Sequence, residues 1–356
     1  MKYHIALSPS CDLQGIAHNA QAKICPSHSI WELSQLLGAK VYQAGEEKVL
    51  PIDRMYAKII GRPEHWALAR KLSLELQEGD VIYCNGEHIG IPLATVCNHE
   101  GRRLKFVVYF HNINRPRGHL ALKLFKIADK IDLFVSTAPS QINFLHHYLG
   151  LPKHQVYQLC SQPVDLSFFT PGLPSNSKER PIIGSGGLEK RDYRTLANAS
   201  KDLDVDIKIC AFSHNAKTLK RSFPKVIPSN MSFRFYEWNE LLQLYRDSDI
   251  VVISLLKNTQ EAGLTTLFEA MACRRPVVIT RAPGLIDNLI DAGIVMGVNP
   301  YDATGMKQAI QSLLNDPHKA EIYAQRGYEL VQKQYNQEKY VQSLFAQLTS
   351  RHDIAI

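Results

Sequence analysis

Short apolar runs alternate with longer amphipathic stretches along the whole chain. In the first half, β-branched and aromatic runs predict strands, while apolar positions three and four apart predict helices near 65–77, 119–129 and 139–149. The predicted strands of this half are 3–7, 40–42, 80–84, 106–110 and 132–136. Strands that alternate with helices are typical of a parallel, doubly wound α/β sheet.

A second series of the same kind follows a proline-rich break at 162–181. Its predicted strands are 182–184, 206–210, 231–235, 250–254, 277–280 and 294–296, and its predicted helices are 191–202, 238–246, 264–273 and 302–315. From about 317 to 350 the pattern is helical only.

These patterns predict two Rossmann-like domains, each with a parallel sheet, that face a cleft. The first is expected over residues 1–165, and the second over 181–335. Residues 166–180 form the linker between them. Residues 336–356 are expected to form a C-terminal helix that packs back on the first domain.

The composition excludes several classes of protein. Of 356 residues, 45% are apolar and 21% are charged, which does not fit disordered, collagen-like or coiled-coil chains. The net charge of +7 is small for this length, and no strip of basic and aromatic residues is visible, so no nucleic-acid partner is expected. Seven scattered cysteines without a CxxC pair indicate neither a disulfide framework nor a zinc site, which favours a cytoplasmic location. The first ten residues lack a signal-peptide core, and no run approaches the ~18 apolar residues of a spanning helix, so any membrane contact is expected to be peripheral.

Functional residues of open α/β sheets are expected in the loops that follow strands. Segment 255–280 is such a loop, and it places Gly263 just before a predicted helix. The backbone N–H groups of Gly263, Leu264 and Thr265, together with the positive end of the helix dipole, predict a phosphate site. Glu269, one to two turns into the helix, is expected to accept hydrogen bonds from ribose hydroxyls.

Glu261 and Glu269 are eight positions apart, a spacing that is weak evidence alone because Glu321 and Glu329 repeat it in the helical tail. Together with the string LFEAMA and the strand PVVIT that follows, however, the segment resembles the retaining glycosyltransferases of family 4, which have the GT-B fold. The resemblance implies that Glu261 contacts the transferred sugar and that Glu269 binds the ribose. An ordinary strand–helix–strand unit with incidental acids is the alternative.

The stretch IGSGGLEKRDYRTLA at 183–197 is similar to the family segment that binds the donor diphosphate. This implies phosphate contacts from Arg191 and Lys190, and a guanidinium suits them because it is always charged and can bind two oxygens at once. For Lys190, a solvated charge at the start of a helix is the alternative. Gly186 and Gly187 stand where the family usually has an arginine, and Arg274 stands where it usually has a glycine.

His111 directly follows a predicted strand, where the family has a histidine that contacts the transferred sugar; an ordinary packing residue is the alternative. The stretch SQPVDLSFFTP at 161–171 is similar to the family's segment at the crossing between domains, with Asp165 and Phe169 on its Asp and Phe. The nucleobase is expected near Tyr236 and Trp238.

The resemblance implies an enzyme that moves a sugar from a nucleotide-diphosphate donor, with UDP favoured, to a hydroxyl of a glycan, lipid or small molecule. It further implies that domain 1–165 lies on the acceptor side and that domain 181–335 binds the nucleotide-sugar. It also implies retention of the anomeric configuration, no metal ion and no other cofactor. Positive groups and helix N–H donors would then stabilise the leaving diphosphate. Two alternatives remain open: a catalytically silent protein that binds nucleotide-sugar, and a sugar-nucleotide epimerase with the same fold.

Basic residues are concentrated in 115–130, with Leu120, Leu124, Ile127 and Ile131 at helical spacing. An ordinary surface helix packed on its sheet explains this pattern. The alternative is a face that contacts anionic membrane or a polyanionic glycan acceptor, as membrane-associated members of the family use their first domain to reach lipid acceptors.

Overall fold

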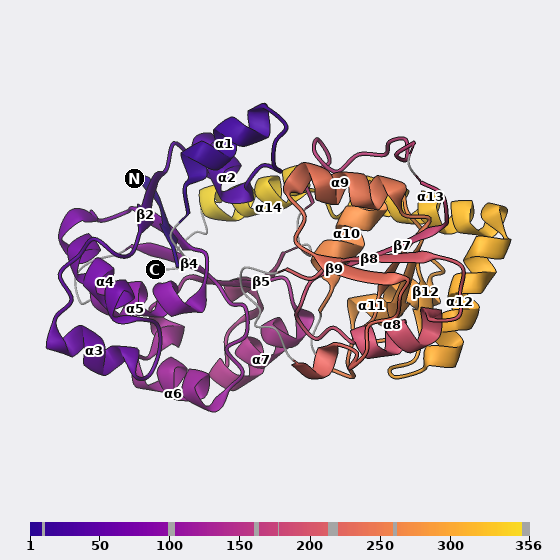
Figure 1. Ribbon diagram of the computed structural model, residues 1–356. Helices are drawn as coiled ribbons and strands as arrows, with labels where there is room; N and C mark the ends of the chain where they lie inside the picture. Colours follow the sequence, from indigo (N-terminus) through magenta and orange to yellow (C-terminus); the bar gives the residue numbers. More distant parts are fainter. Residues whose placement is uncertain are drawn as a thin grey trace. The chain divides into compact units, whose positions relative to one another are not determined.

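The computed structural model describes residues 1–8, 11–98, 104–159, 164–176, 178–212, 220–258 and 262–350. The chain forms two compact units, each with a parallel sheet of its own (Figure 1). Unit 1 consists of Met1–Ala17, His28–Ser161 and Tyr340–Ile356, and unit 2 consists of His18–Ser27 and Gln162–Lys339. Unit 2 therefore includes a short early segment, His18–Ser27, that the hydrophobic pattern did not assign to it.

Unit 1 is built on a six-stranded sheet in the order β2-β1-β3-β4-β5-β6, with every neighbouring pair parallel. The strands are β1 (Tyr3–Leu7), β2 (Lys40–Gln43), β3 (Val81–Cys84), β4 (Lys105–Tyr109), β5 (Leu133–Ser136) and β6 (Val156–Gln158). The predicted α/β fold class is confirmed, and the five expected strands are present. The edge strand β6 was not predicted, because its three residues are half-buried or exposed and give no apolar run.

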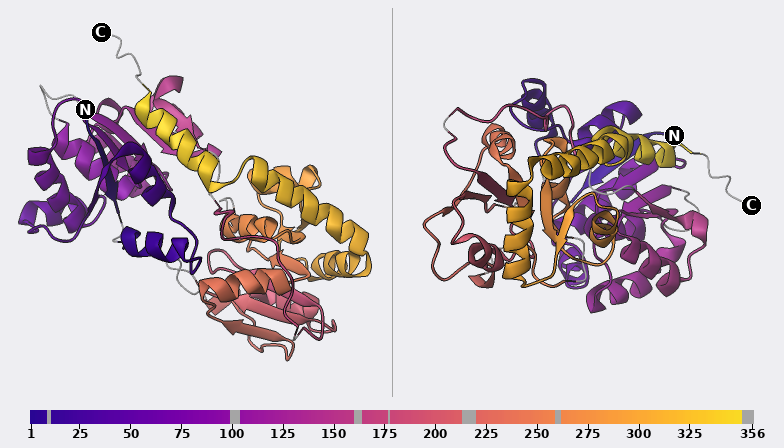
Figure 2. Two further views of the ribbon diagram at one scale, coloured as in Figure 1. Left: turned by 90° about the horizontal axis from the view of Figure 1, so that it is seen from above. Right: turned by 90° about the vertical axis from the view of Figure 1, so that its right-hand side faces the viewer.

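Side chains of this sheet point alternately to two faces, and helices cover both of them. On one face, Ile82 and Phe106 lie in a core with the helices α3 (Pro51–Ala57), α4 (Pro63–Glu75), α5 (Glu87–Cys97), α6 (Pro116–Leu124) and α7 (Pro139–Leu149). On the other face, Tyr83 and Val107 pack against residues of α1 (Leu13–Gln21), α2 (Ser29–Leu37) and α14 (Gln337–Thr349). Figure 2 shows α14 lying along the sheet of unit 1.

Helix α14 completes the core of unit 1, although it follows unit 2 in the sequence. Its buried face is formed by Tyr340, Val341, Leu344 and Leu348. At the C-terminal end of α14, Nζ of Lys105 donates to three backbone carbonyls, those of Gln347 (3.1 Å), Leu348 (3.4 Å) and Ser350 (2.9 Å). These carbonyls lack partners within the helix, so the lysine satisfies them and also complements the negative end of the helix dipole.

The helix predicted over 119–129 is wrong in its extent. Helix α6 begins earlier and ends at Leu124, because Lys126 adopts a left-handed conformation (φ 49°) before the short 3-10 helix η1 (Ile127–Asp129). The four apolar residues therefore do not form one stripe. Ile127 and Ile131 are buried in the core, whereas Leu120 and Leu124 are 52% and 54% exposed.

Unit 2 has a second six-stranded parallel sheet, in the order β12-β11-β10-β7-β8-β9. Its strands are β7 (Ile182–Gly186), β8 (Asp206–Cys210), β9 (Met231–Arg234), β10 (Ile250–Ile253), β11 (Val277–Thr280) and β12 (Met296–Val298). All six were predicted, although β12 lies at Met296–Val298 instead of 294–296.

Helices also cover both faces of this second sheet. One face packs against α8 (Tyr193–Ser200) and α12 (Ala303–Asn315). The other packs against α9 (Trp238–Asp247), α10 (Leu264–Ala272), α11 (Leu285–Asp291) and α13 (Pro317–Lys333). Short 3-10 helices η2 (Lys153–Gln155) and η3 (Lys220–Ser222) complete the described elements. None of the helices in the described part of the chain has the length and apolar character that crossing a membrane requires.

Asp165 joins distant segments within unit 2. Its carboxylate accepts hydrogen bonds from the backbone N–H groups and hydroxyls of both Ser27 and Ser167. Although burial raises the pKa of Asp165, these hydrogen bonds outweigh burial and hold the pKa below its usual value. Gln337 donates to the Ser27 hydroxyl at 2.6 Å. The early segment that ends at Ser27 is therefore fixed to unit 2 by polar contacts, which explains why an apolar pattern did not reveal it.

We predict that Leu344→Ala destabilises unit 1 by roughly 2–5 kcal/mol, because Leu344 is fully buried and its truncation leaves a cavity. Urea unfolding monitored by tryptophan fluorescence measures this in a Trp238→Phe background, since the other two tryptophans, Trp31 and Trp66, both belong to unit 1. Gln342→Ala, on the exposed face of the same helix, is the matched control. Equal urea midpoints for the two variants would show that α14 is not part of the core of unit 1.

Candidate functional site

The guanidinium of Arg191 connects two segments of unit 2 that were predicted separately to bind phosphate. Arg191 lies in the loop after β7 and is only 3% exposed. Its Nε donates to the carbonyl of Gly186 at 2.6 Å, and its Nη1 donates to that of Glu189 at 2.9 Å. Its Nη2 donates to Oγ1 of Thr266, in the first turn of α10, at 3.2 Å. Among the described residues, no carboxylate forms an ion pair with this guanidinium.

The loop that carries Arg191 is held against the end of β10 by backbone hydrogen bonds. Leu256 donates to the carbonyl of Lys190 at 2.8 Å, and Asp192 donates to that of Ser254 at 2.9 Å. Lys190 has a left-handed backbone (φ 53°), which is uncommon for a residue with a side chain. At Gly187 (φ 88°), a β-carbon would lie 2.6 Å from Nη2 of Arg191. The glycine therefore allows the backbone of this turn to approach the guanidinium closely.

Helix α10 begins beside this guanidinium. Gly263 is its N-cap, with φ 86°, and a side chain there would collide with Ile253 and lie 3.5 Å from Nη1 of Arg191. A glycine N-cap has no side chain to satisfy the first N–H groups of the helix, and the helix dipole adds partial positive charge at this point. The structure thus brings together Arg191, Gly263 and the first turn of α10, and this arrangement suits a phosphate. Leu264 is buried and Thr265 is exposed, so from these two residues the backbone and the threonine hydroxyl are the groups suited to a phosphate.

Glu269 lies in the same helix, and its carboxylate is hydrogen bonded to a residue that sequence reasoning missed. Its Oε2 accepts a hydrogen bond from the hydroxyl of Tyr245 in α9 at 2.6 Å. Burial raises the pKa of Glu269 to about 7, while the Tyr245 hydroxyl and the positive charge of Arg191 act in the opposite direction. Tyr245 lies in an ordinary amphipathic helix, and no motif marks it.

The two residues expected beside the nucleobase are placed differently from each other. Tyr236 is buried next to Cys210, and the guanidinium of Arg234 covers its ring at 3.7 Å from the centroid. Burial raises the pKa of the Cys210 thiol, and the nearby carboxylate of Glu269 raises it further, so Tyr236 and Glu269 belong to one neighbourhood. Trp238, at the start of α9, is 38% exposed and makes edge contacts with aromatic rings of the 164–176 segment.

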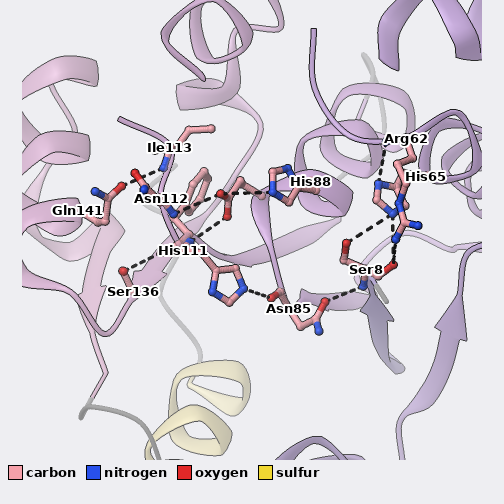
Figure 3. Close-up of polar contacts among 12 residues, drawn as sticks. Ser8, Arg62, His65, Asn85, His88, His111, Asn112, Ile113, Ser136 and Gln141 are labelled. Carbon is pink, nitrogen blue, oxygen red and sulfur yellow. Dashed lines mark hydrogen bonds and ion pairs between the residues drawn. The ribbon is translucent and has the colours of Figure 1, made fainter. Parts of the chain in front are cut away.

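In unit 1, His111 lies at the carboxyl end of the sheet, as predicted, and its orientation is fixed by neighbouring groups (Figure 3). Its Nε2 is 2.9 Å from the carbonyl oxygen of Asn85, which can only accept, so the ring carries a proton on Nε2. Its backbone N–H donates to Oε2 of Glu87 at 2.9 Å. Glu87 is 1% exposed and stands in the first turn of α5, where the helix dipole stabilises its charge.

The loop after β1 is held by a second histidine. Nδ1 of His65 accepts the backbone N–H of Arg62 at 3.1 Å, so the proton of a neutral ring is on Nε2, which is 3.3 Å from the carbonyl of Ser8 (Figure 3). The side chain of Asn85 accepts the backbone N–H of Ser8 at 2.8 Å. Burial lowers the pKa of His65 to about 4. A neutral histidine therefore joins α4 to the loop after β1.

Sequence reasoning did not single out Asn85, Glu87 or His65. Asn85 and Glu87 directly follow β3, and the rule that pointed to His111, polar residues just after a strand, applies to them equally. Glu261 lies outside the described residues. No group of three or more His, Cys, Asp or Glu side chains within the described ranges could hold a metal ion.

A comparison with protein families matches residues 195–330 to the model described as glycosyl transferases group 1. The likeness to group 1 glycosyltransferases therefore concerns 136 of the 356 residues. The matched stretch lies within unit 2 and contains α10 with Glu269, as well as Tyr236, Trp238 and Tyr245. The match confirms the predicted enzyme class, a glycosyltransferase, at the level of group 1. A comparison with curated proteins found no match.

Solved structures with the same fold support the GT-B prediction. Sucrose-phosphate synthase from Thermosynechococcus elongatus is 16% identical with a TM-score of 0.68, and each chain is covered to 97%. The Anabaena protein HepE in complex with UDP and glucose is 14% identical with a TM-score of 0.70, covering 98% of this chain and 100% of that one. An α,α-trehalose-phosphate synthase (UDP-forming) from Burkholderia vietnamiensis is 12% identical with a TM-score of 0.69, covering 98% of both. At such identities the likeness shows the fold alone, and the predicted GT-B fold is confirmed.

We predict that His65 makes the stability of unit 1 fall as the pH is lowered from about 6.5 to 4. In this range the unfolded chain takes up a proton at His65 and the folded chain does not, so the free energy of unfolding decreases, by up to about 3 kcal/mol. His65→Gln can accept from Arg62 and donate to Ser8 without titrating. Urea unfolding at several pH values should therefore show a shallower pH dependence for the variant. The same slope in both proteins would contradict a neutral, buried His65.

Proposed function

We propose that this protein transfers a sugar, with retention of configuration, from a UDP-sugar to a hydroxyl of an acceptor, without a metal ion, in the manner of family 4. The observation that carries the proposal is the buried guanidinium of Arg191 beside the N-terminus of α10. A buried cation with no carboxylate partner in the described part of the chain calls for an anion, and the diphosphate of a nucleotide-sugar supplies one.

The same arrangement accounts for transfer without a metal. Negative charge develops on the diphosphate as the sugar departs, and groups already in position stabilise it without rearrangement. Arg191 contributes a fixed positive charge, and the first turn of α10 contributes backbone N–H groups. In the proposed front-face reaction, an oxygen of the leaving phosphate accepts the proton of the acceptor hydroxyl, so no protein base is required. Glu269 binds the ribose, and Glu261 and His111 contact the sugar. Lys190 assists Arg191 at the diphosphate.

UDP is favoured as the nucleotide because similar folds are found in the HepE complex with UDP and glucose and in a UDP-forming synthase. The two alternative functions, an epimerase and a silent binding protein, can be distinguished by what happens to a UDP-sugar in the absence of an acceptor. An epimerase would convert it into a second sugar nucleotide without any acceptor, and a silent binding protein would leave it intact. A glycosyltransferase would hydrolyse it slowly, with water as a poor acceptor.

On the acceptor side, we propose that unit 1 contacts an anionic membrane through α3 and α6. Tyr56 of α3 packs edge-on against Phe125, the residue after α6, so the two helices are neighbours. Their exposed apolar residues are Ile52, Met55, Leu120 and Leu124. Their exposed basic residues, with Lys126 just beyond α6, are Arg54, Lys58, Arg115, Arg117, Lys123 and Lys126. Apolar side chains surrounded by positive charge are suited to an anionic lipid surface.

We predict that UDP binds with equal affinity in EDTA and in Mg²⁺, and that Arg191→Lys weakens UDP binding by roughly tenfold or more, because lysine keeps the charge but loses the two-pronged contact. Isothermal titration calorimetry measures both effects. Arg194→Lys, at an exposed position of α8, is the matched control and should bind UDP normally.

The same preparation tests the reaction itself. With UDP-glucose as the probe, slow hydrolysis in EDTA should release α-glucose first, as NMR can detect before the anomers interconvert. Loss of UDP binding on chelation, restored by Mg²⁺, would contradict a metal-independent site. Release of β-glucose would contradict retention.

We predict that changing Arg115, Arg117 and Lys123 together to Glu abolishes sedimentation with vesicles containing phosphatidylglycerol and leaves UDP affinity unchanged. The loss should be greatest at low salt, where charges are least screened. A control with the same change in net charge replaces exposed lysines elsewhere, namely Lys201, Lys225 and Lys333, by Glu. If both variants sediment with vesicles equally well, the α3–α6 surface is not a membrane contact.

A further inference from the structure

Tyr245 is a buried residue of unit 2 whose hydroxyl donates a hydrogen bond to Glu269, the proposed ribose-binding residue. The ring is 2% exposed and packs edge-on against Phe169 at 6.0 Å between centroids. The hydroxyl donates to Oε2 of Glu269 at 2.6 Å, a short distance typical of a hydrogen bond to a carboxylate. Burial raises the pKa of Tyr245 well above its usual value, so the hydroxyl keeps its proton and remains the donor.

This contact leaves the two oxygens of the carboxylate in different situations. Oε2 is occupied by Tyr245, whereas none of the described residues donates a hydrogen bond to Oε1. A carboxylate that is held at one oxygen cannot rotate freely, so the direction in which Oε1 presents its lone pairs is fixed before a ligand arrives. Such prior orientation lowers the entropy that binding costs.

We propose that Tyr245 is a positioning residue, which holds Oε2 of Glu269 so that Oε1 accepts a ribose hydroxyl of the donor, and that donor binding releases a proton from this carboxyl group to solvent. The inference rests on the proposed function, because it assumes that a nucleotide occupies this site. It goes beyond that function by assigning a role to a residue that no substrate atom needs to touch, and by coupling donor binding to pH.

The proton release follows from the chemistry of the contact. A ribose hydroxyl that donates needs an acceptor, and both oxygens of an ionised carboxylate accept. In the free protein the pKa of Glu269 is raised to about 7 by burial, so an appreciable share of molecules carries a proton there at neutral pH. The charge that acts on it is that of Arg191, in the loop after β7, which lowers its pKa. The thiols of Cys210 at the end of β8 and Cys273 at the end of α10 also lie near it, and burial and the Glu269 carboxylate raise their pKa values, so they stay protonated.

The experiment compares UDP with 2′,3′-dideoxy-UDP as ligands of the full chain, by calorimetry between pH 6 and 8. The terminal phosphate of both ligands titrates in this range, so only the difference between them reports on the ribose contact. We expect UDP to lose affinity relative to the dideoxy compound as the pH falls, by about tenfold between pH 8 and pH 6, because only the ionised form of Glu269 binds the ribose.

Tyr245→Phe keeps the ring and removes the hydroxyl. The limb is the pH range over which the ratio of UDP affinity to dideoxy-UDP affinity falls. Because the lost hydrogen bond favoured the ionised carboxylate, this limb should move to higher pH, and the preference for UDP over dideoxy-UDP at pH 8 should shrink. Tyr323→Phe is the control, since it removes another tyrosine hydroxyl of unit 2, that of a half-buried residue packed against the core formed with α8 and α12. It should leave the position of the limb unchanged.

Three results would overturn the inference, each in a recognisable way. If neither ligand binds, the proposed function fails and the inference with it. If both bind with the same pH dependence, a nucleotide site exists but Glu269 does not bind the ribose. If the limb is present and Tyr245→Phe leaves it in place, Tyr245 has no positioning role. Should Tyr245→Phe not fold, Glu269→Gln tests the proton release, because an amide does not titrate and the limb should disappear.

Discussion

The functional end of unit 2 depends on one buried cation. Arg191 has almost no contact with solvent, and its guanidinium is held by two backbone carbonyls and the hydroxyl of Thr266. The loop after β7 and the first turn of α10, which come from distant parts of the sequence, are therefore fixed relative to each other. Burying a charge is costly unless the protein solvates it, and no carboxylate in the described part of the chain neutralises this one. The proposed diphosphate would supply the missing negative charge.

At the carboxyl end of the sheet in unit 1, a buried charged side chain also fixes loop backbone, but here the charge is negative. Glu87 is buried at the start of α5 and accepts the backbone N–H of His111, while Asn85 fixes the imidazole ring. In both units, polar side chains solvate backbone groups at the ends of parallel strands, where the regular hydrogen bonding of the sheet stops. Loops that would otherwise be mobile are held in one conformation by these contacts.

The sequence predicted strands better than helices, and the reason is physical. Strands buried on both faces give short apolar runs, and eleven of the twelve strands in the described part of the chain were predicted. Helix α5 was missed because it is buried nearly all round, contains Pro92, and packs so closely on β4 that a β-carbon at Gly90 would lie 2.3 Å from Val108. An amphipathic period does not arise in a helix without a solvent face. Of the candidate site, the predicted positions of Arg191, Gly263 and Glu269 come together in the structure. Tyr245 could not be found, because its role depends on the distance between two helices, which no local pattern encodes.

The position of α14 has a consequence for how the protein is made. The apolar face formed by β1, β3, β4 and β5 is completed by Tyr340, Leu344 and Leu348, which are synthesised after all of unit 2. Domains generally fold as units while the chain emerges from the ribosome, N-terminal parts first. In this protein the strands of unit 1 are synthesised first, and one apolar face of their sheet stays partly uncovered until α14 emerges. Unit 2, whose described core needs no residue beyond Lys339, can reach its native state before unit 1 does. During synthesis, unit 1 therefore exposes apolar surface for longer than unit 2 does.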